Sequence, residues 1–136
     1  MRNIYFVLLF FFAACSPSSI EEFQLAGEGI ARGLLKQLEK VQSISDLKRE
    51  GPKLKKEYAH LAQVMIAAKK FQNRHPDEEM PSLKRLEVSE ALKKEFIRIY
   101  HLEGCSELME ALQRESLHKL DLYHRRLEAS RTETFR

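Results

Sequence analysis

Residues 52–74 read PKLKKEYAHLAQVMIAAKKFQNR, and this stretch predicts a long amphipathic helix. Its apolar residues recur at three- and four-residue spacing, which places them on one face of an α-helix. The stripe consists of Leu54, Tyr58, Leu61, Met65 and Ala68. Pro52 suits a first helical position, where its missing N–H would be unpaired anyway. His75-Pro76 ends the pattern because a residue before proline avoids helical angles.

The middle of this stretch, residues 61–68 (LAQVMIAA), is apolar on nearly every side. Such a segment is typical of the most buried helix of a bundle, and we expect burial here. An exposed patch for a partner protein or a membrane is the alternative.

Three further segments show the same period. They run from about Ser19 to Val41, from about Ser82 to Leu102, and from a capping Ser106 to about Ala129. Ser19-Ile20-Glu21-Glu22 matches a capping box. Residues 43–51 are expected to form a break, with a short turn of helix at Asp46–Glu50, that is ended by Gly51-Pro52. Strand signals are nearly absent. The sequence therefore predicts an all-α fold, a small antiparallel bundle of about four helices over residues 20–129, with a flexible tail at residues 130–136.

Each helix is expected to turn its apolar stripe inward. In the third segment these residues are Leu83, Leu86, Leu92, Phe96 and Ile99, and in the fourth they are Leu108, Met109, Leu112, Leu120, Tyr123 and Leu127. The first helix contains Gly27, Gly29 and Gly33, each unfavourable in a helix. Close packing or a loosened helix explains them most simply, and a groove for an apolar ligand is the alternative.

Composition fits one globular domain. The chain has 136 residues, of which 43% are hydrophobic and 32% charged, with a formal net charge of +3. Basic residues alternate with glutamate, as in Lys53-Leu54-Lys55-Lys56-Glu57, which is typical of a solvated helix face. A nucleic-acid binder usually shows a basic stripe without acids, so no nucleic-acid partner is expected.

The N-terminus has the features of an export signal. Met1-Arg2-Asn3 supplies a positive start, and residues 4–14 (IYFVLLFFFAA) are wholly apolar. This run is within the length of a signal-peptide core and shorter than the roughly 20 residues that cross a bilayer.

Phe12-Ala13-Ala14-Cys15 resembles the lipobox of bacterial lipoproteins, although Phe12 stands where that class usually has leucine. The resemblance implies that the Cys15 thiol takes a diacylglyceryl group and that a peptidase cuts just before it. Residues 1–14 would then be a signal peptide and residues 15–19 a lipidated cysteine and tether. Ser16 implies sorting to the outer membrane. An ordinary cleaved signal and a buried N-terminal helix are the alternatives.

The second cysteine, Cys105, has no intramolecular partner if Cys15 is lipidated. Its place near a predicted helix start could lower its pKa and make it reactive, with His101 as the nearby histidine. A buried thiol packing as a small apolar group is the simpler expectation.

Metal sites are weakly indicated. His118, Asp121 and His124 have the spacing for one zinc ion. Glu57–His60 and Glu115–His118 match half of a di-iron pattern, and His101 and Cys105 could form a metal-binding pair. Helical geometry places most of these side chains on solvent-exposed faces of the helices, so neither a metal nor another cofactor is expected.

The sequence shows no catalytic constellation, and two functions fit its features. The first is a non-enzymatic lipoprotein of the bacterial cell envelope, anchored through Cys15, with a helical domain that engages another protein from the outer membrane, facing the periplasm or the cell surface. The alternative is a ligand- or metal-binding lipoprotein of the periplasm.

Overall fold

A computed structural model describes residues 17–79 and 87–134, and these residues form four helices and no β-strand. Helix α2 spans Ile20–Glu39, α3 spans Ile44–Arg74, α4 spans Glu87–Tyr100 and α5 spans Cys105–Thr134. The prediction of an all-α helical bundle is confirmed.

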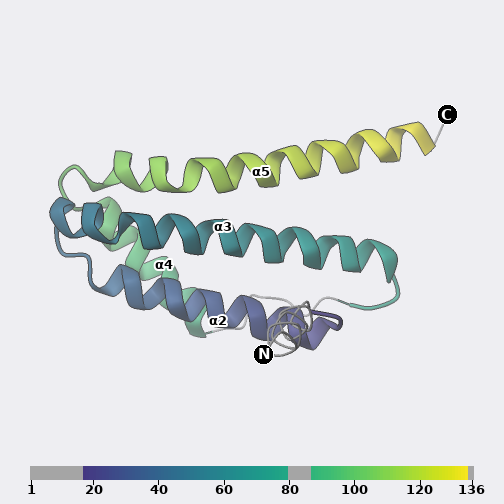
Figure 1. Cartoon of the computed structure of the whole chain (residues 1–136), viewed down its shortest axis with the longest axis horizontal. Helices are drawn as coiled ribbons and strands as arrows, with labels where there is room; N and C mark the ends of the chain where they lie inside the picture. The colour runs from purple at the N-terminus through teal and green to yellow at the C-terminus, as the bar shows by residue number, and fades with distance from the viewer. Residues whose placement is uncertain (1–16, 80–86, 135–136) are drawn as a thin grey trace, which may run out of the picture.

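Helix α3 is the central element, with α2 on one side, α5 on the other and α4 behind (Figure 1). Helices α2 and α3 run antiparallel, and the rings of Phe23 and Phe71 meet at a centroid distance of 5.5 Å. Helices α3 and α5 run parallel (Figure 1). Lys55 Nζ accordingly lies 3.3 Å from Glu115 Oε2, and farther along both helices Lys70 lies over the Tyr123 ring.

Helices α3 and α4 follow one another in the chain but lie on a diagonal of the bundle. Their backbones do not pack together along the described helices, and contact is made through side chains such as the rings of Tyr58 and Phe96, 6.4 Å apart. Consecutive helices alternate in direction, as expected for an antiparallel bundle (Figure 1). Two of the packed pairs, α3 with α5 and α2 with α4, are nevertheless parallel.

The predicted cap of α2 is present. The Glu22 N–H donates to Ser19 Oγ at 3.3 Å, and the Glu22 carboxylate accepts from the backbone N–H and the hydroxyl of Ser18. These hydrogen bonds, that from the Ser18 N–H first, lower the pKa of Glu22. Ser19 is thus the predicted cap, and Ser18, which the sequence placed in the tether, also belongs to the helix start.

The predicted break over residues 43–51 is wrong, because α3 already begins at Ile44. Ser43 Oγ accepts from the Asp46 N–H at 3.3 Å, and the Asp46 carboxylate accepts from the Gln42 N–H at 2.9 Å. Pro52 lies inside the helix, where it removes one backbone hydrogen bond. Leu47 before the proline and Leu54 after it are both fully shielded from solvent, so the apolar stripe continues through the proline.

The turn between α4 and α5 depends on Gly104, whose φ of +73° is a left-handed conformation that favours glycine. Helix α5 begins at the next residue, Cys105, so Ser106 lies in the first turn and is not the predicted cap. The predicted beginning of α4 near Ser82, with Leu83 and Leu86, lies outside the described residues.

Helix α5 continues to Thr134, past the predicted end at Ala129. The hydroxyls of Ser130, Thr132 and Thr134 donate to backbone carbonyls three or four residues earlier. Residues 130–134 of the predicted tail are therefore helical, and residues 135–136 lie outside the description.

The core is concentrated at the end of the bundle that holds the α2–α3 and α4–α5 turns. Seven side chains there have no solvent exposure, namely Leu38, Val41, Leu47, Leu54, Ile99, Cys105 and Met109. Residues 61–68 are less buried than predicted, since Met65 is 45% exposed and only Ala62 is fully buried. Helix α4, with 14 residues, is about 21 Å long and closes only part of the bundle along α3, which is about 46 Å long.

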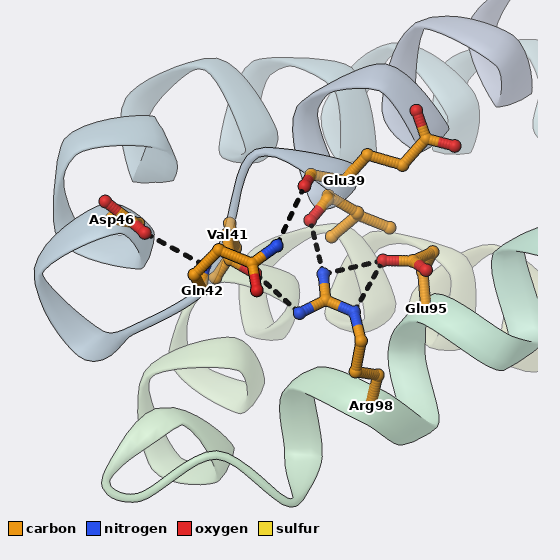
Figure 2. A network of polar contacts seen from close by, with 7 residues as sticks. Glu39, Val41, Gln42, Asp46, Glu95 and Arg98 are labelled. Carbon is orange, nitrogen blue, oxygen red and sulfur yellow. Dashed lines mark hydrogen bonds and ion pairs between the residues drawn. The ribbon is translucent and has the colours of Figure 1, made fainter.

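The Arg98 guanidinium of α4 binds the C-terminal end of α2 (Figure 2). Its Nη1 donates to the Val41 carbonyl at 2.6 Å, and its Nη2 donates to the Leu38 carbonyl at 3.0 Å. The Glu95 carboxylate accepts from Arg98 Nε and Nη2 and holds the guanidinium in place. Leu38 lies in the last turn of α2, where its carbonyl also accepts from the Val41 N–H, and Val41 lies just beyond the helix. Arg98 therefore fixes α4 against the C-terminal end of α2.

We expect Arg98→Ala to lower the free energy of unfolding by about 2 kcal/mol, because charged hydrogen bonds to two carbonyls are lost. Arg98→Lys should restore only part of the lost free energy of unfolding, since an ammonium group lacks the planar fork of the guanidinium. Urea denaturation measures the free energy of unfolding of both variants. Arg32→Ala is the control, because it removes an exposed i,i+4 pair with Glu28 worth at most about 0.5 kcal/mol. Equal losses for Arg98→Ala and Arg32→Ala would contradict this role.

Close packing does not explain the first two glycines of α2. A Cβ added at Gly27 or Gly29 would have no atom within 4 Å, and one at Gly33 would meet only the Glu57 carboxylate at 3.9 Å. The first half of α2 therefore contains glycine where alanine would fit.

Gly27→Ala and Gly29→Ala should each raise the free energy of unfolding by about 1 kcal/mol, the difference in helix propensity between the two residues. Gly104→Ala is the control with the opposite sign: it should lower the free energy of unfolding by about 1 kcal/mol, because alanine is strained at positive φ. Thermal denaturation compares the three variants, and a loss of stability at Gly27 or Gly29 would reveal a packing role.

Candidate functional site

Helix α4 carries a shallow, open depression of about 640 Å³. Leu92, Phe96 and Tyr100 are half-buried and form its floor, while Ile97 is 51% exposed at its edge. Phe96 also stacks on Tyr58 of α3, so the floor is the outer surface of the core. The depression is therefore apolar and supported from beneath by packed side chains.

A second depression, of about 460 Å³, lies between the end of α4 and the middle of α5. It mixes charges of both signs with apolar side chains; its lining is Tyr100, Glu110, Gln113, Arg114, Leu117, His118 and Asp121. Leu117 is an exposed large apolar residue on this side of α5.

The three weak metal candidates, His118, Asp121 and His124, are all exposed on α5. His118 and Asp121 line the second depression, and the His124 ring lies 6.3 Å from the Tyr123 ring. Among residues 17–79 and 87–134, no three His, Cys, Asp or Glu side chains are placed to hold one ion. A zinc site at these residues gains no geometric support.

The two Glu-x-x-His pairs do not face each other across the core. Glu57 lies half-buried against Gly33 of α2, whereas His60 is exposed. Glu115 and His118 are both exposed on α5. Hydrogen bonds and charge interactions from Lys55 and Lys119 lower the pKa of Glu115, so this carboxylate serves surface ion pairs.

Cys105 is fully buried, as the simpler of the two expectations held. Burial raises the pKa of its thiol, because a thiolate is poorly solvated among apolar side chains. The helix start at Cys105 therefore does not produce a reactive nucleophile. His101 is exposed, on the rim of the apolar depression.

Two buried polar features were not identified from the sequence. Glu50 is only 6% exposed, and its Oε2 has no hydrogen-bond partner among the described residues. Burial raises the pKa of Tyr58 to about 12, and its hydroxyl accepts from Gln113 Nε2 at 3.4 Å. The apolar stripe places Tyr58 inward, but neither the period nor a motif reveals the hydrogen bond of its hydroxyl or the burial of Glu50. The Ser43-x-x-Asp46 capping pattern, by contrast, could have revealed the start of α3.

Comparison with protein-family models, with curated proteins and with solved structures gives no match to this chain. Within the described part of the chain, no helix has the length and apolar character needed to span a membrane. The function must therefore be argued from the residues themselves.

Proposed function

We propose that this protein is a lipid-anchored envelope protein of bacteria, attached through Cys15, whose helical domain is a non-enzymatic module that engages another protein. The membrane is the outer membrane, and the domain faces the periplasm or the cell surface. The observation that carries the proposal is the lipobox-like Phe12-Ala13-Ala14-Cys15, which ends an apolar run and stands five residues before α2 begins at Ile20.

The position of the first cap supports an anchor close to the domain. Ser18 and Ser19 are already bonded to Glu22, so Ser16 and Pro17 are the residues left to separate the cap from Cys15. A short link of this kind holds a folded domain near the lipid surface, because an extended chain spans at most about 3.6 Å per residue.

The apolar depression on α4 supports a protein partner. Ile97 exposes a large apolar side chain beside the half-buried Phe96 and Tyr100. Apolar surface of this kind is covered favourably by an apolar side chain of another protein, because contact removes it from water. The alternative of a metal-binding lipoprotein has less support, since within residues 17–79 and 87–134 no third ligand is placed beside His118 and Asp121.

Cys15→Ser should abolish labelling of the protein by a radioactive or clickable fatty acid in cells, because no other thiol occupies the lipobox. Fractionation of the cells should then show the protein released from the membrane fraction, because the acyl chains no longer attach it. Cys105→Ala is the matched control, since it removes the other cysteine and should leave labelling intact. Persistent labelling of Cys15→Ser would refute the anchor.

A photo-crosslinking amino acid at Ile97 should trap a discrete protein partner in intact cells, because this side chain stands at the rim of the apolar depression. The same group at Gln63, an exposed position on α3, should not trap it. Immunoblotting of the crosslinked protein measures the shift in size. Identical patterns from the two positions would count against α4 as the contact surface.

A further inference from the structure

The exposed surface of α3 carries charge of one sign. Every exposed charged side chain of this helix is a lysine or an arginine, while its acidic residues, Asp46, Glu50 and Glu57, are buried or half-buried. We call this surface the basic face of α3; its residues are Lys48, Arg49, Lys53, Lys55, Lys56, Lys70 and Arg74. The alternation of lysine and glutamate along the sequence is therefore not an alternation on the surface.

None of the three acidic residues of α3 is exposed. The Asp46 carboxylate accepts from the Gln42 N–H at the start of the helix. Glu50 is buried, with its Oε1 3.5 Å from Arg49 Nε. The Glu57 carboxylate lies beside Gly33, toward α2. These positions turn the negative charges of α3 away from its outer side.

Part of the basic face is neutralised by neighbours, and part is not. Lys55 pairs with Glu115 of α5 and Arg49 with Asp46. Lys48, Lys53 and Lys56 are exposed and form no ion pair with any residue in the described ranges. These three lysines lie within about two turns of one helix, roughly 12 Å of its axis, and their charges repel one another unless an anionic surface meets them.

We propose that the basic face of α3 lies on an anionic phospholipid surface, so that the domain rests lengthwise on its membrane. This inference rests on the lipid anchor proposed above. Positive residues close to an anionic bilayer are attracted to it over about one Debye length, roughly 10 Å. The charge and the extended shape of the face match such a surface.

The link to Cys15 brings the basic face within reach of lipid headgroups. Cys15 stands five residues before Ile20, an extended distance of at most about 18 Å. The first turns of α2 contact the last turns of α3 through Phe23 and Phe71, so the anchored end of the bundle is also an end of the basic face. Nucleic acid has the same charge as the lipid surface, but the anchor favours the membrane.

The exposed side of α4, which carries Ile97, would then face away from the lipid. Helices α3 and α4 occupy a diagonal of the bundle, and their side chains meet in its centre at Tyr58 and Phe96. Their outer sides consequently point in opposite directions. A domain lying on α3 keeps α4 open to a protein partner.

The test measures the distance of each face from the bilayer in the lipidated full chain. A fluorophore is attached to Gln63→Cys on α3 or, as the control, to Ile97→Cys on α4; Cys105 is buried and does not compete for the label. The protein is reconstituted into vesicles of phosphatidylcholine, with or without phosphatidylglycerol, that carry an energy acceptor on their headgroups. We expect stronger energy transfer from position 63 than from position 97 in the anionic vesicles, and loss of that difference at high salt.

Charge variants identify the residues responsible. Lys48→Gln/Lys53→Gln/Lys56→Gln should abolish the strong transfer from position 63, whereas Lys36→Gln/Lys93→Gln/Lys94→Gln removes the same charge from exposed positions on α2 and α4 and should leave it unchanged. Equal transfer from both faces, no effect of phosphatidylglycerol, or equal effects of the two triple variants would overturn the proposal.

The proposal of a lipid anchor and the proposal for the basic face can be refuted separately. If acyl labelling shows no lipid on Cys15, co-sedimentation of the full chain with the same vesicles still tests the face. The α3 triple variant should then bind anionic vesicles on the order of a hundredfold more weakly than the control triple variant, at about fivefold per basic residue. Binding to a short DNA duplex that the α3 triple variant loses, without binding to vesicles, would assign the face to nucleic acid instead.

Discussion

The guanidinium of Arg98 donates to two carbonyl groups, one in the last turn of α2 and one just beyond it, from a helix almost 60 residues later in the chain. One side chain thus orients α4 on α2 and closes the region where Val41, Leu47 and Ile99 are fully buried. Glu95 keeps the guanidinium in that geometry. Because polar groups that lose water must be paired, this contact and the apolar core around it depend on each other.

The order of the helices follows from that closed end. Helix α4 packs on α2, α5 packs on α3, and α3 and α4 take the diagonal (Figure 1). The outer sides of α3 and α4 therefore differ in direction and in chemistry. Helix α3 shows exposed lysine and arginine, and α4 shows an apolar depression beside Ile97. A lipid-anchored domain with these two surfaces has one side suited to a membrane and the other suited to a protein.

Sequence patterns located the helices better than their ends or their burial. The stripe through Leu54 and Tyr58 placed α3, but Gly51-Pro52 suggested a boundary that the structure does not have, because the helix continues through the proline with Leu47 and Leu54 buried on either side of it. Residues 61–68 were expected to be the most buried, yet Met65 is 45% exposed. Burial depends on the length of neighbouring helices, which the period of α3 cannot reveal.

The sequence by itself determined the local features: the amphipathic period of each helix, the Ser19 cap, and the apolar run that ends at Cys15. These features depend on residues a few positions apart. Tertiary structure alone decided that Arg98 binds the end of α2 and that Glu50 and Glu57 turn inward while the nearby lysines remain exposed. The reason is that burial and pairing depend on which helices pack together, and that choice involves contacts between residues far apart in the chain.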